Sequence, residues 1–191
     1  ALRKYKIKYI TAYPASIAYM IELSNKETID LPHLKGVMLG SENVYESQVK
    51  RIKEFFKIDK VFSGYGHGEA TVAAGTCLQE FNYHFHPAYG YVEFIKPTNK
   101  QRYKHKEIKE IIGTSFINPL MPLIRYKSND FGVELMSKCS CGSHHKAMSQ
   151  IFGREQEIAI GRNNEKITLT ALVFGRHCEY FTKVYKMQIV N

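Results

Sequence analysis

The sequence lacks the features that mark a secreted or membrane-spanning protein. Only four of its 191 residues are cysteines, too few and too scattered for a disulfide scaffold, which favours a reducing cytoplasm. No apolar run approaches the roughly 20 residues that a membrane helix needs. The basic N-terminal stretch is not followed by the apolar core of a signal peptide. We therefore expect a soluble, cytoplasmic protein with no membrane partner.

Several common active-site motifs are also missing. The sequence contains no G-x-S-x-G, no Walker A loop and no Rossmann fingerprint. Neither Cys77 nor Cys178 lies in a recognisable activation context. These absences argue against a serine or cysteine nucleophile.

The composition is that of a packed globular protein, with 44% hydrophobic and 13% aromatic residues. The formal net charge of +9 is compatible with nucleic acid, nucleotides or coenzyme A as partners. Because the basic residues are spread along the chain, the charge alone does not choose among these partners.

The first third of the sequence predicts alternating strands and helices. Apolar runs at 8–13, 35–41 and 60–66 are typical of short buried strands. Pro14 suits the first turn of a helix that continues over about 15–23. This order is that of a parallel sheet with crossover helices.

A second helix is expected before the third strand. Asn43 and Glu46 have the spacing of a capping box. Behind them, Val49, Ile52 and Phe56 fall on one helical face, with lysines opposite.

The pattern of residue types along the sequence changes after Gly75. Short β-rich segments broken by Gly, Pro and Asn predict a meander or small barrel over 76–150. A further change near Arg154 indicates a domain boundary. Beyond it the sequence predicts a hairpin turn at Asn163-Asn164, a helix over about 172–181 and a strand at 186–190. The fold class is therefore α/β, with a parallel or mixed sheet, then a β-rich subdomain, then the start of a small α+β domain.

Two short motifs carry candidate binding residues. In "GYGHGEA" (64–70), glycines such as Gly66 allow a ligand close to the backbone, Tyr65 can lie on a base, and Glu69 suits a hard cation such as Mg²⁺. In "PLIRYKSND" (122–130), Asp130 follows an apolar strand and can accept hydrogen bonds from a sugar diol. Arg125, at mid-strand, needs an anionic partner if it is buried. An ordinary turn and an ordinary strand end are the simpler explanations.

The segment "CSCGSHH" (139–145) has metal-ligand chemistry. Cys139 and Cys141 can reach one zinc ion only if the backbone turns between them, and other ligands must come from elsewhere. Cys77 and His84 lie in the first strand of the same β-rich region. Alternative ligands are His86, His144 and His145.

Taken in order, these segments resemble the AMP-forming adenylate enzymes, in particular phenylacetate–coenzyme A ligase and its relatives in capsular polysaccharide gene clusters. The resemblance rests on "AYPASIAYMIE", "LGSENVYESQ", "GYGHGE", "TCLQEFNYHFH", "PLIRYKSND", "CSCG" and "IFGRE". It implies an ATP-dependent ligase that converts a carboxylic acid into an acyl-AMP and passes the acyl group to a thiol such as coenzyme A.

The resemblance also implies residue roles. Ser41 and Glu42 would lie by the adenine, Tyr65 would stack on it, and Glu69 would hold Mg²⁺. Asp130 would bind the ribose, with Gly66 beside the nucleotide. Tyr13 and Pro14 would line the acyl pocket, and Arg125 would support the nucleotide loop. Arg154 would begin the hinge. The ligands of a structural zinc site would be Cys77, His84, Cys139 and Cys141.

The sequence also departs from the family pattern. Gly68 stands where the family has Ser or Thr, and Gln156 and Glu157 stand where it prefers Asp, so the acid and the acceptor are open. No Ser/Thr/Gly-rich phosphate loop is present. We therefore expect 1–153 to be the later part of the adenylation domain and 154–191 the hinge and start of the small domain, inactive by themselves.

Two other interpretations compete with the ligase. A basic zinc-ribbon module that binds nucleic acid accounts for the charge and for "CSCGSHH", but not for "GYGHGE" or "PLIRYKSND". A non-catalytic remnant of the adenylation fold is a third reading. If the chain is part of a ligase, we expect its partners to be small molecules (an acid, ATP and coenzyme A) and not nucleic acid. A homodimer is compatible with this interpretation.

Overall fold

A computed structural model of the chain describes residues 2, 4–24, 29–97, 108–154, 158–160 and 166–168. Its first part alternates strands and helices in the expected order. These elements are β1 (Tyr9–Ala12), α1 (Pro14–Leu23), β2 (Gly36–Leu39), α2 (Glu46–Phe56) and β3 (Val61–Gly66). β2 pairs in parallel with β1 and with β3. The predicted parallel sheet with crossover helices is confirmed.

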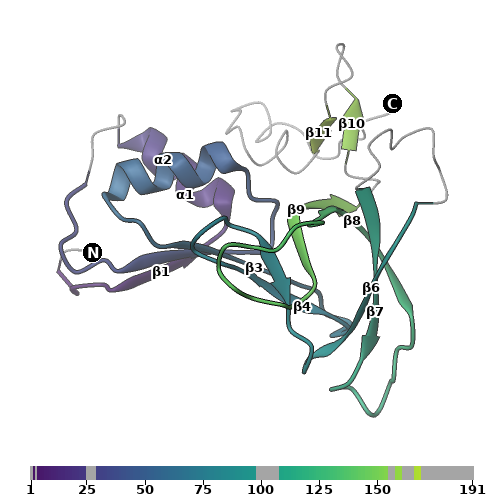
Figure 1. Ribbon diagram of the computed structural model, residues 1–191. Coiled ribbons are helices and arrows are strands. Elements are labelled where there is room, and N and C mark those ends of the chain that lie inside the picture. The colour runs from purple at the N-terminus through teal and green to yellow at the C-terminus, as the bar shows by residue number, and fades with distance from the viewer. Residues whose placement is uncertain are drawn as a thin grey trace, which may run out of the picture.

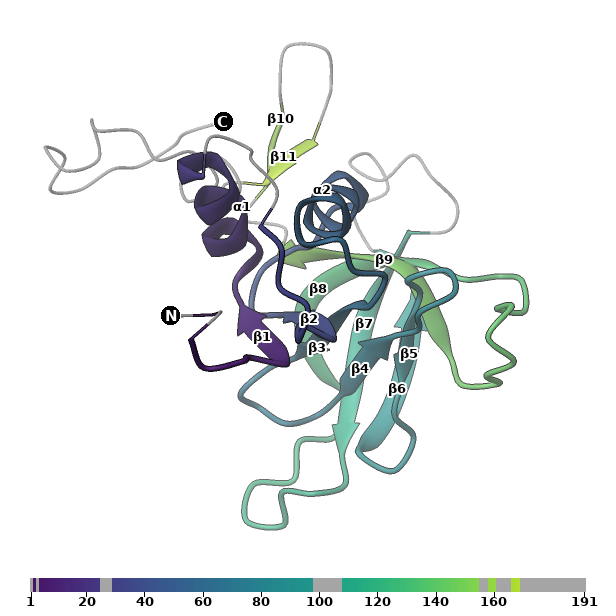
Figure 2. The ribbon, with the colours of Figure 1, turned by 90° about the vertical axis from the view of Figure 1, so that its left-hand side faces the viewer.

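Both helices cover the same face of this parallel sheet (Figures 1 and 2). The strand order follows the chain order, and right-handed crossovers then bring successive helices to one side. Val37 and Leu39 of β2 point into the resulting core. The helices contribute the buried side chains Ile17, Ile21, Val49, Ile52, Phe55 and Phe56.

The start of α2 differs from the prediction. The N-cap is Tyr45 rather than Asn43, and its backbone N–H donates a hydrogen bond of 3.0 Å to the side-chain oxygen of Gln48. Val44 is buried in the core, which keeps the chain extended up to Tyr45 and delays the first helical turn to Glu46. The predicted capping box is therefore wrong, although the predicted apolar face of α2 is confirmed.

The β-rich region extends the same sheet with antiparallel strands. They are β4 (Ala73–Thr76), β5 (Tyr83–Phe85), β6 (Gly90–Ile95), β7 (Ile108–Ser115), β8 (Tyr126–Glu134) and β9 (Ala147–Arg154). The sheet order is β1-β2-β3-β4-β5-β9-β8-β7-β6. Strands β6 to β9 form the expected meander, and β9 also pairs with β5. The sheet of nine strands is therefore mixed, with β3 between its parallel and antiparallel parts.

The antiparallel part curls until the segment before β4 lies against β6 and β7. The Ser115 hydroxyl donates a hydrogen bond of 2.9 Å to the carbonyl oxygen of Ala70. A Cβ at Gly90 would collide with the Thr71 carbonyl oxygen, and one at Gly113 with the Thr71 side chain. Glycine at these two positions is thus required for the curled shape.

A separate two-stranded antiparallel sheet consists of β10 (Ile158–Ile160) and β11 (Lys166–Thr168). These strands agree with the predicted hairpin, whose turn at Asn163-Asn164 lies outside the described residues, as do the helix predicted over 172–181 and the strand predicted at 186–190. Within the described part of the chain, no helix is long and apolar enough to cross a membrane.

Candidate functional site

The segments that follow β1, β2 and β3 carry most of the predicted ligand-binding residues. Tyr13 and Pro14 follow β1, Ser41 and Glu42 follow β2, and Gly66 ends β3. Because the three strands are parallel, their carboxyl ends meet at one edge of the sheet, where α/β proteins bind ligands.

The carboxylate of Glu42 is already engaged at this edge. The backbone N–H of Ala15 donates a hydrogen bond of 3.0 Å to Glu42 Oε2. This N–H is one of those that an α-helix leaves unpaired at its start, and a negative charge there is favourable. Glu42 therefore fastens the loop after β2 to the start of α1, beside the two residues predicted for the acyl pocket.

Tyr65 and Asp130 come from strands far apart in the sequence and meet in the structure. The Tyr65 hydroxyl donates a hydrogen bond of 2.8 Å to Asp130 Oδ2. The Tyr65 ring packs edge-on against Phe85, with ring centroids 6.0 Å apart. Two residues predicted to hold the two ends of a nucleoside are thus direct neighbours.

A bulge in β8 sets the position of Asp130. Asn129 has φ of 60°. One residue of β7 lies between Glu110 and Ile112, whereas residues 128–130 of β8 all lie between their pairing partners Lys127 and Phe131. The backbone N–H of Asp130 donates to the Ser128 hydroxyl at 3.1 Å. Bulges of this kind redirect a side chain out of the regular alternation. The prediction that Asp130 follows a strand is wrong, since it lies within β8.

The carboxylate of Glu69 is held by two side chains that the sequence analysis did not select. Tyr126 donates its hydroxyl to Glu69 Oε1 at 3.0 Å, and His67 Nδ1 lies 3.0 Å from Glu69 Oε2. The pKa of Glu69 is lowered, first by a hydrogen bond from its own backbone N–H and then by the hydrogen bond from Tyr126. Burial opposes these two effects, and the charge of His67 adds a smaller lowering. His67 lies two residues from Glu69 in the same motif, so a search for donors beside Glu69 would have found it. Tyr126 lies 57 residues away and gives no such local signal.

Arg125 does not occupy the mid-strand position expected for it. It precedes β8, has φ of 51°, and its side chain is 62% exposed. Its Nε donates to Glu93 Oε2 on β6 at 3.0 Å. Arg125 was expected to need an anionic partner if it were buried; it is exposed, and its ion pair with Glu93 lies at the surface. Arg154 ends β9 in register with Asp130, and its role as a hinge stays a prediction.

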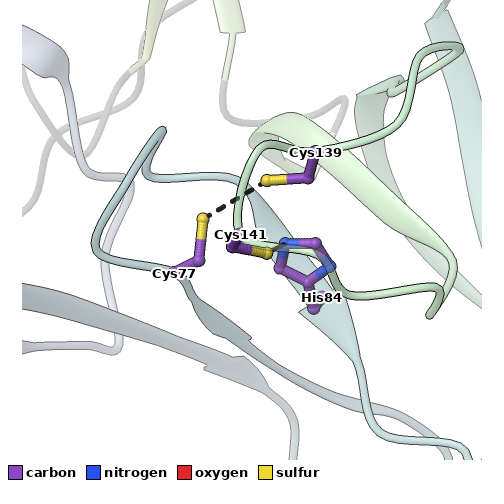
Figure 3. Close-up of side chains that lie close together, drawn as sticks. All are labelled: Cys77, His84, Cys139 and Cys141. Carbon is purple, nitrogen blue, oxygen red and sulfur yellow. Dashed lines mark hydrogen bonds between the residues drawn. The ribbon is translucent and has the colours of Figure 1, made fainter.

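Cys77, His84, Cys139 and Cys141 converge on one point (Figure 3). Their ligand atoms all lie within 4.8 Å of one another. The Sγ atoms of Cys77 and Cys139 are 3.6 Å apart, and Cys141 Sγ is 3.4 Å from His84 Nε2. A tetrahedral zinc ion with bonds of about 2.3 Å to sulfur and about 2.0 Å to nitrogen requires edges of roughly 3.5–3.8 Å. The two shorter distances match these edges, and the other ligand atoms lie within 4.8 Å, so small side-chain shifts suffice for the four residues to hold a zinc ion.

A tight turn brings the two ligands of the C-x-C pair together. The backbone N–H of Gly142 donates to the Cys139 carbonyl at 3.1 Å, and Gly142 has φ of 79°, a conformation that favours glycine. The backbone therefore turns between the cysteines, as their spacing requires. Among the alternative ligands, His86, His144 and His145 are all exposed, whereas His84 is buried.

The thiols differ in proton affinity. Burial raises the pKa of Cys77, but hydrogen bonds from the Glu80 backbone, from His84 and from the Asn82 backbone outweigh it and bring the pKa to about 6. Burial raises the pKa of Cys139 to about 11. One thiolate is thus favoured in the cluster before any metal binds, and the thiolate is the form that binds metals.

The fold is one shared with CoA ligases of known structure. No family model and no curated protein matches the sequence. The structure of 2-hydroxyisobutyryl-CoA ligase in complex with R3-HIB-AMP superposes with a TM-score of 0.63 at 21% identity, over 91% of this chain. Its complex with 2-HIB-AMP and CoA, in an open conformation, gives 0.60 at 21% identity over 87% of this chain.

A second CoA ligase has a similar structure. The anthranilate CoA ligase AuaEII, in complex with anthranoyl-AMP, gives a TM-score of 0.55 at 12% identity over 87% of this chain. The chain spans 38% of the length of the first ligase and 33% of the length of the second. At these identities the likeness establishes the fold.

Proposed function

We propose that this chain is the nucleotide-binding part of an AMP-forming acid–thiol ligase. The main support is the meeting of Tyr65 and Asp130, from β3 and β8, in a fold shared with ligases that bind acyl adenylates. Residues 1–153 belong in this proposal to the large domain, with 76–150 as its β-rich subdomain, and 154–191 to the hinge and the small domain.

In the proposed reaction, a carboxylate oxygen of the acid attacks the α-phosphorus of ATP. The new oxygen–phosphorus bond forms as the bond to pyrophosphate breaks, and a thiol then displaces AMP from the acyl carbon. Asp130 would accept hydrogen bonds from the ribose hydroxyls, and Tyr65 would lie against the adenine. Ser41, Glu42 and Gly66 would line the same edge.

The other proposed roles concern the acid, the cation and the domain movement. Tyr13 and Pro14 would contact the acid, and Arg154 would begin the hinge. Glu69 would be the protein ligand of Mg²⁺, which neutralises phosphate charge and commonly binds one or two carboxylates together with substrate phosphates. The Glu69 side chain is 32% exposed, so its carboxylate can reach a ligand. Arg125 would support the nucleotide loop.

The finer assignment is to the phenylacetate–coenzyme A ligase and capsular polysaccharide branch, with coenzyme A as acceptor. A structural zinc ion at Cys77, His84, Cys139 and Cys141 belongs to the same proposal. Its support is the geometric fit of four ligand atoms from three separate segments. Zinc here would link the β4–β5 loop and β5 to the segment before β9.

Binding of AMP to the ¹⁵N-labelled chain, followed by NMR titration in EDTA, tests the proposed function. We expect amides of β3 and β8 to shift. Asp130→Asn should weaken binding about tenfold, because a hydrogen bond to a charged group contributes roughly 1.5–3 kcal/mol. Asp59→Asn, at an exposed turn, is the matched control. A chain with no AMP-dependent shifts would refute the proposal.

A further inference from the structure

The turn after β3 brings three side chains of one short segment together. The backbone N–H of Ala70 donates to the His67 carbonyl at 3.1 Å, and Ala70 has φ of 54°. His67 Nε2 lies 3.2 Å from the Thr71 hydroxyl, and its Nδ1 lies 3.0 Å from Glu69. Nε2 of the imidazole is therefore within hydrogen-bond distance of Thr71, and Nδ1 faces the Glu69 carboxylate at ion-pair distance without a hydrogen bond of good geometry.

Packing fixes the plane of this imidazole as well. The His67 side chain is only 10% exposed. Its ring centroid lies 6.3 Å from that of Tyr65 and 5.9 Å from that of Tyr126. Thr71 is fully buried and is held between the strands by the close approach of Gly90 and Gly113. His67 thus belongs to the rigid part of the fold.

Tyr126 reaches the same carboxylate from another strand. It is the first residue of β8, and its hydroxyl bonds to Glu69 Oε1 while His67 faces Oε2. Each oxygen of Glu69 therefore has its own partner, from β8 and from the turn. A carboxylate oxygen has two lone pairs, so each oxygen keeps one for a further ligand.

We propose that His67 and Tyr126 are positioning residues that hold the Glu69 carboxylate ready for the magnesium ion of a bound nucleotide. A glutamate loses rotamer freedom when it is ordered, and here the fold has fixed it before the ligand arrives. Such partners of a metal ligand affect metal affinity although they do not touch the metal. The inference rests on the proposed function, since it concerns Glu69 in that role.

The test compares ATP binding with and without Mg²⁺. NMR titrations of the labelled chain give the dissociation constant of AMP in EDTA, and those of ATP in EDTA and in excess Mg²⁺. The ratio of the two ATP values measures the benefit of Mg²⁺. We expect His67→Ala to reduce this ratio about tenfold and to leave the AMP value unchanged. Tyr126→Phe should act in the same direction.

Conservative variants separate positioning from folding. In His67→Asn the amide nitrogen can take the place of Nδ1, which faces Glu69, so the ratio should recover. In His67→Gln the amide nitrogen can take the place of Nε2, which faces Thr71, so the ratio should stay low. His33→Ala and Tyr91→Phe, at exposed positions, are the matched controls.

Each outcome decides one question. If His67→Ala keeps the wild-type ratio, the inference is overturned while AMP binding still supports the proposed function. If His67→Ala weakens AMP in EDTA as much as ATP with Mg²⁺, His67 has only a structural role, which also overturns it. A wild-type chain that does not bind AMP would overturn the proposed function and this inference together.

Discussion

The parallel and antiparallel parts of the nine-stranded sheet keep their shape by different means. The parallel part packs two helices against one face and buries a large apolar cluster that includes Ile21, Val37 and Leu39. The antiparallel part has a smaller apolar cluster, together with specific polar contacts and the four-ligand group. Apolar burial tolerates small displacements, whereas hydrogen bonds and metal ligands do not. The Glu69 carboxylate and the four-ligand group both lie in the part with directional contacts.

The largest test of this difference is removal of the proposed zinc site. In Cys139→Ser we expect bound zinc to fall from about one ion per chain to nearly none, because a tetrahedral site needs four ligands. The free energy of unfolding of the antiparallel part should fall by several kcal/mol, since metal binding contributes directly to folding. Metal analysis and amide hydrogen exchange measure the two effects.

Exchange should accelerate in β5 and β9 and stay slow in β2. The matched control is Cys178→Ser, which changes the remaining cysteine of the sequence. Wild-type protein without zinc, or equal loss of protection in both parts of the sheet, would contradict the prediction.

A smaller effect is expected at the contact that closes the curl. Gly90→Ala introduces a methyl group against the Thr71 carbonyl oxygen, and overpacking of this kind costs about 1–3 kcal/mol in the free energy of unfolding. Gly68→Ala is the control, because no atom lies within 4 Å of a Cβ there. Urea denaturation compares the two variants. Equal effects would show that Thr71 is not a constraint.

The smallest effect is expected where the two parts meet. Tyr83 of β5 donates its hydroxyl to Ser63 of β3 at 2.9 Å, and both are buried. Tyr83→Phe leaves Ser63 without this partner and should lower the free energy of unfolding by about 1 kcal/mol at pH 7.

This effect should depend on pH in a defined direction. Burial raises the pKa of Tyr83, and the hydrogen bond to Ser63 offsets a smaller part of that rise. The neutral phenol is therefore favoured in the folded state, so its contribution is complete below the unfolded pKa of about 10 and is lost as the pH rises through the folded pKa. Urea titrations at pH 7 and pH 11 should show the advantage of wild type over Tyr83→Phe shrinking. A constant difference would argue against it.

Sequence reasoning succeeded where a local pattern determines the structure. The apolar periodicity of α2, the Pro14 start of α1 and the strands of the parallel sheet follow from local chemistry. Residue type and region suggested a metal site and left several histidines open, and the family resemblance implied the set of four candidate ligands, which converge in the structure.

It failed where position depends on contacts between distant segments. The bulge that redirects Asp130 depends on the pairing of β8 with β7, and the start of α2 depends on the burial of Val44. Tyr126 was missed as a partner of Glu69 for the same reason, because it is 57 residues away in the sequence. A single sequence does not encode such pairings in a local pattern.

The position of β3 has a consequence for protein engineering. It hydrogen-bonds in parallel to β2 on one side and antiparallel to β4 on the other. A chimera that joined two related chains inside β3 would combine two sets of pairing partners in one strand. A chimera junction at Lys57, in the left-handed turn that ends α2, would keep β3 and its antiparallel neighbours in the same parent sequence. That turn is therefore the natural place to join two related chains.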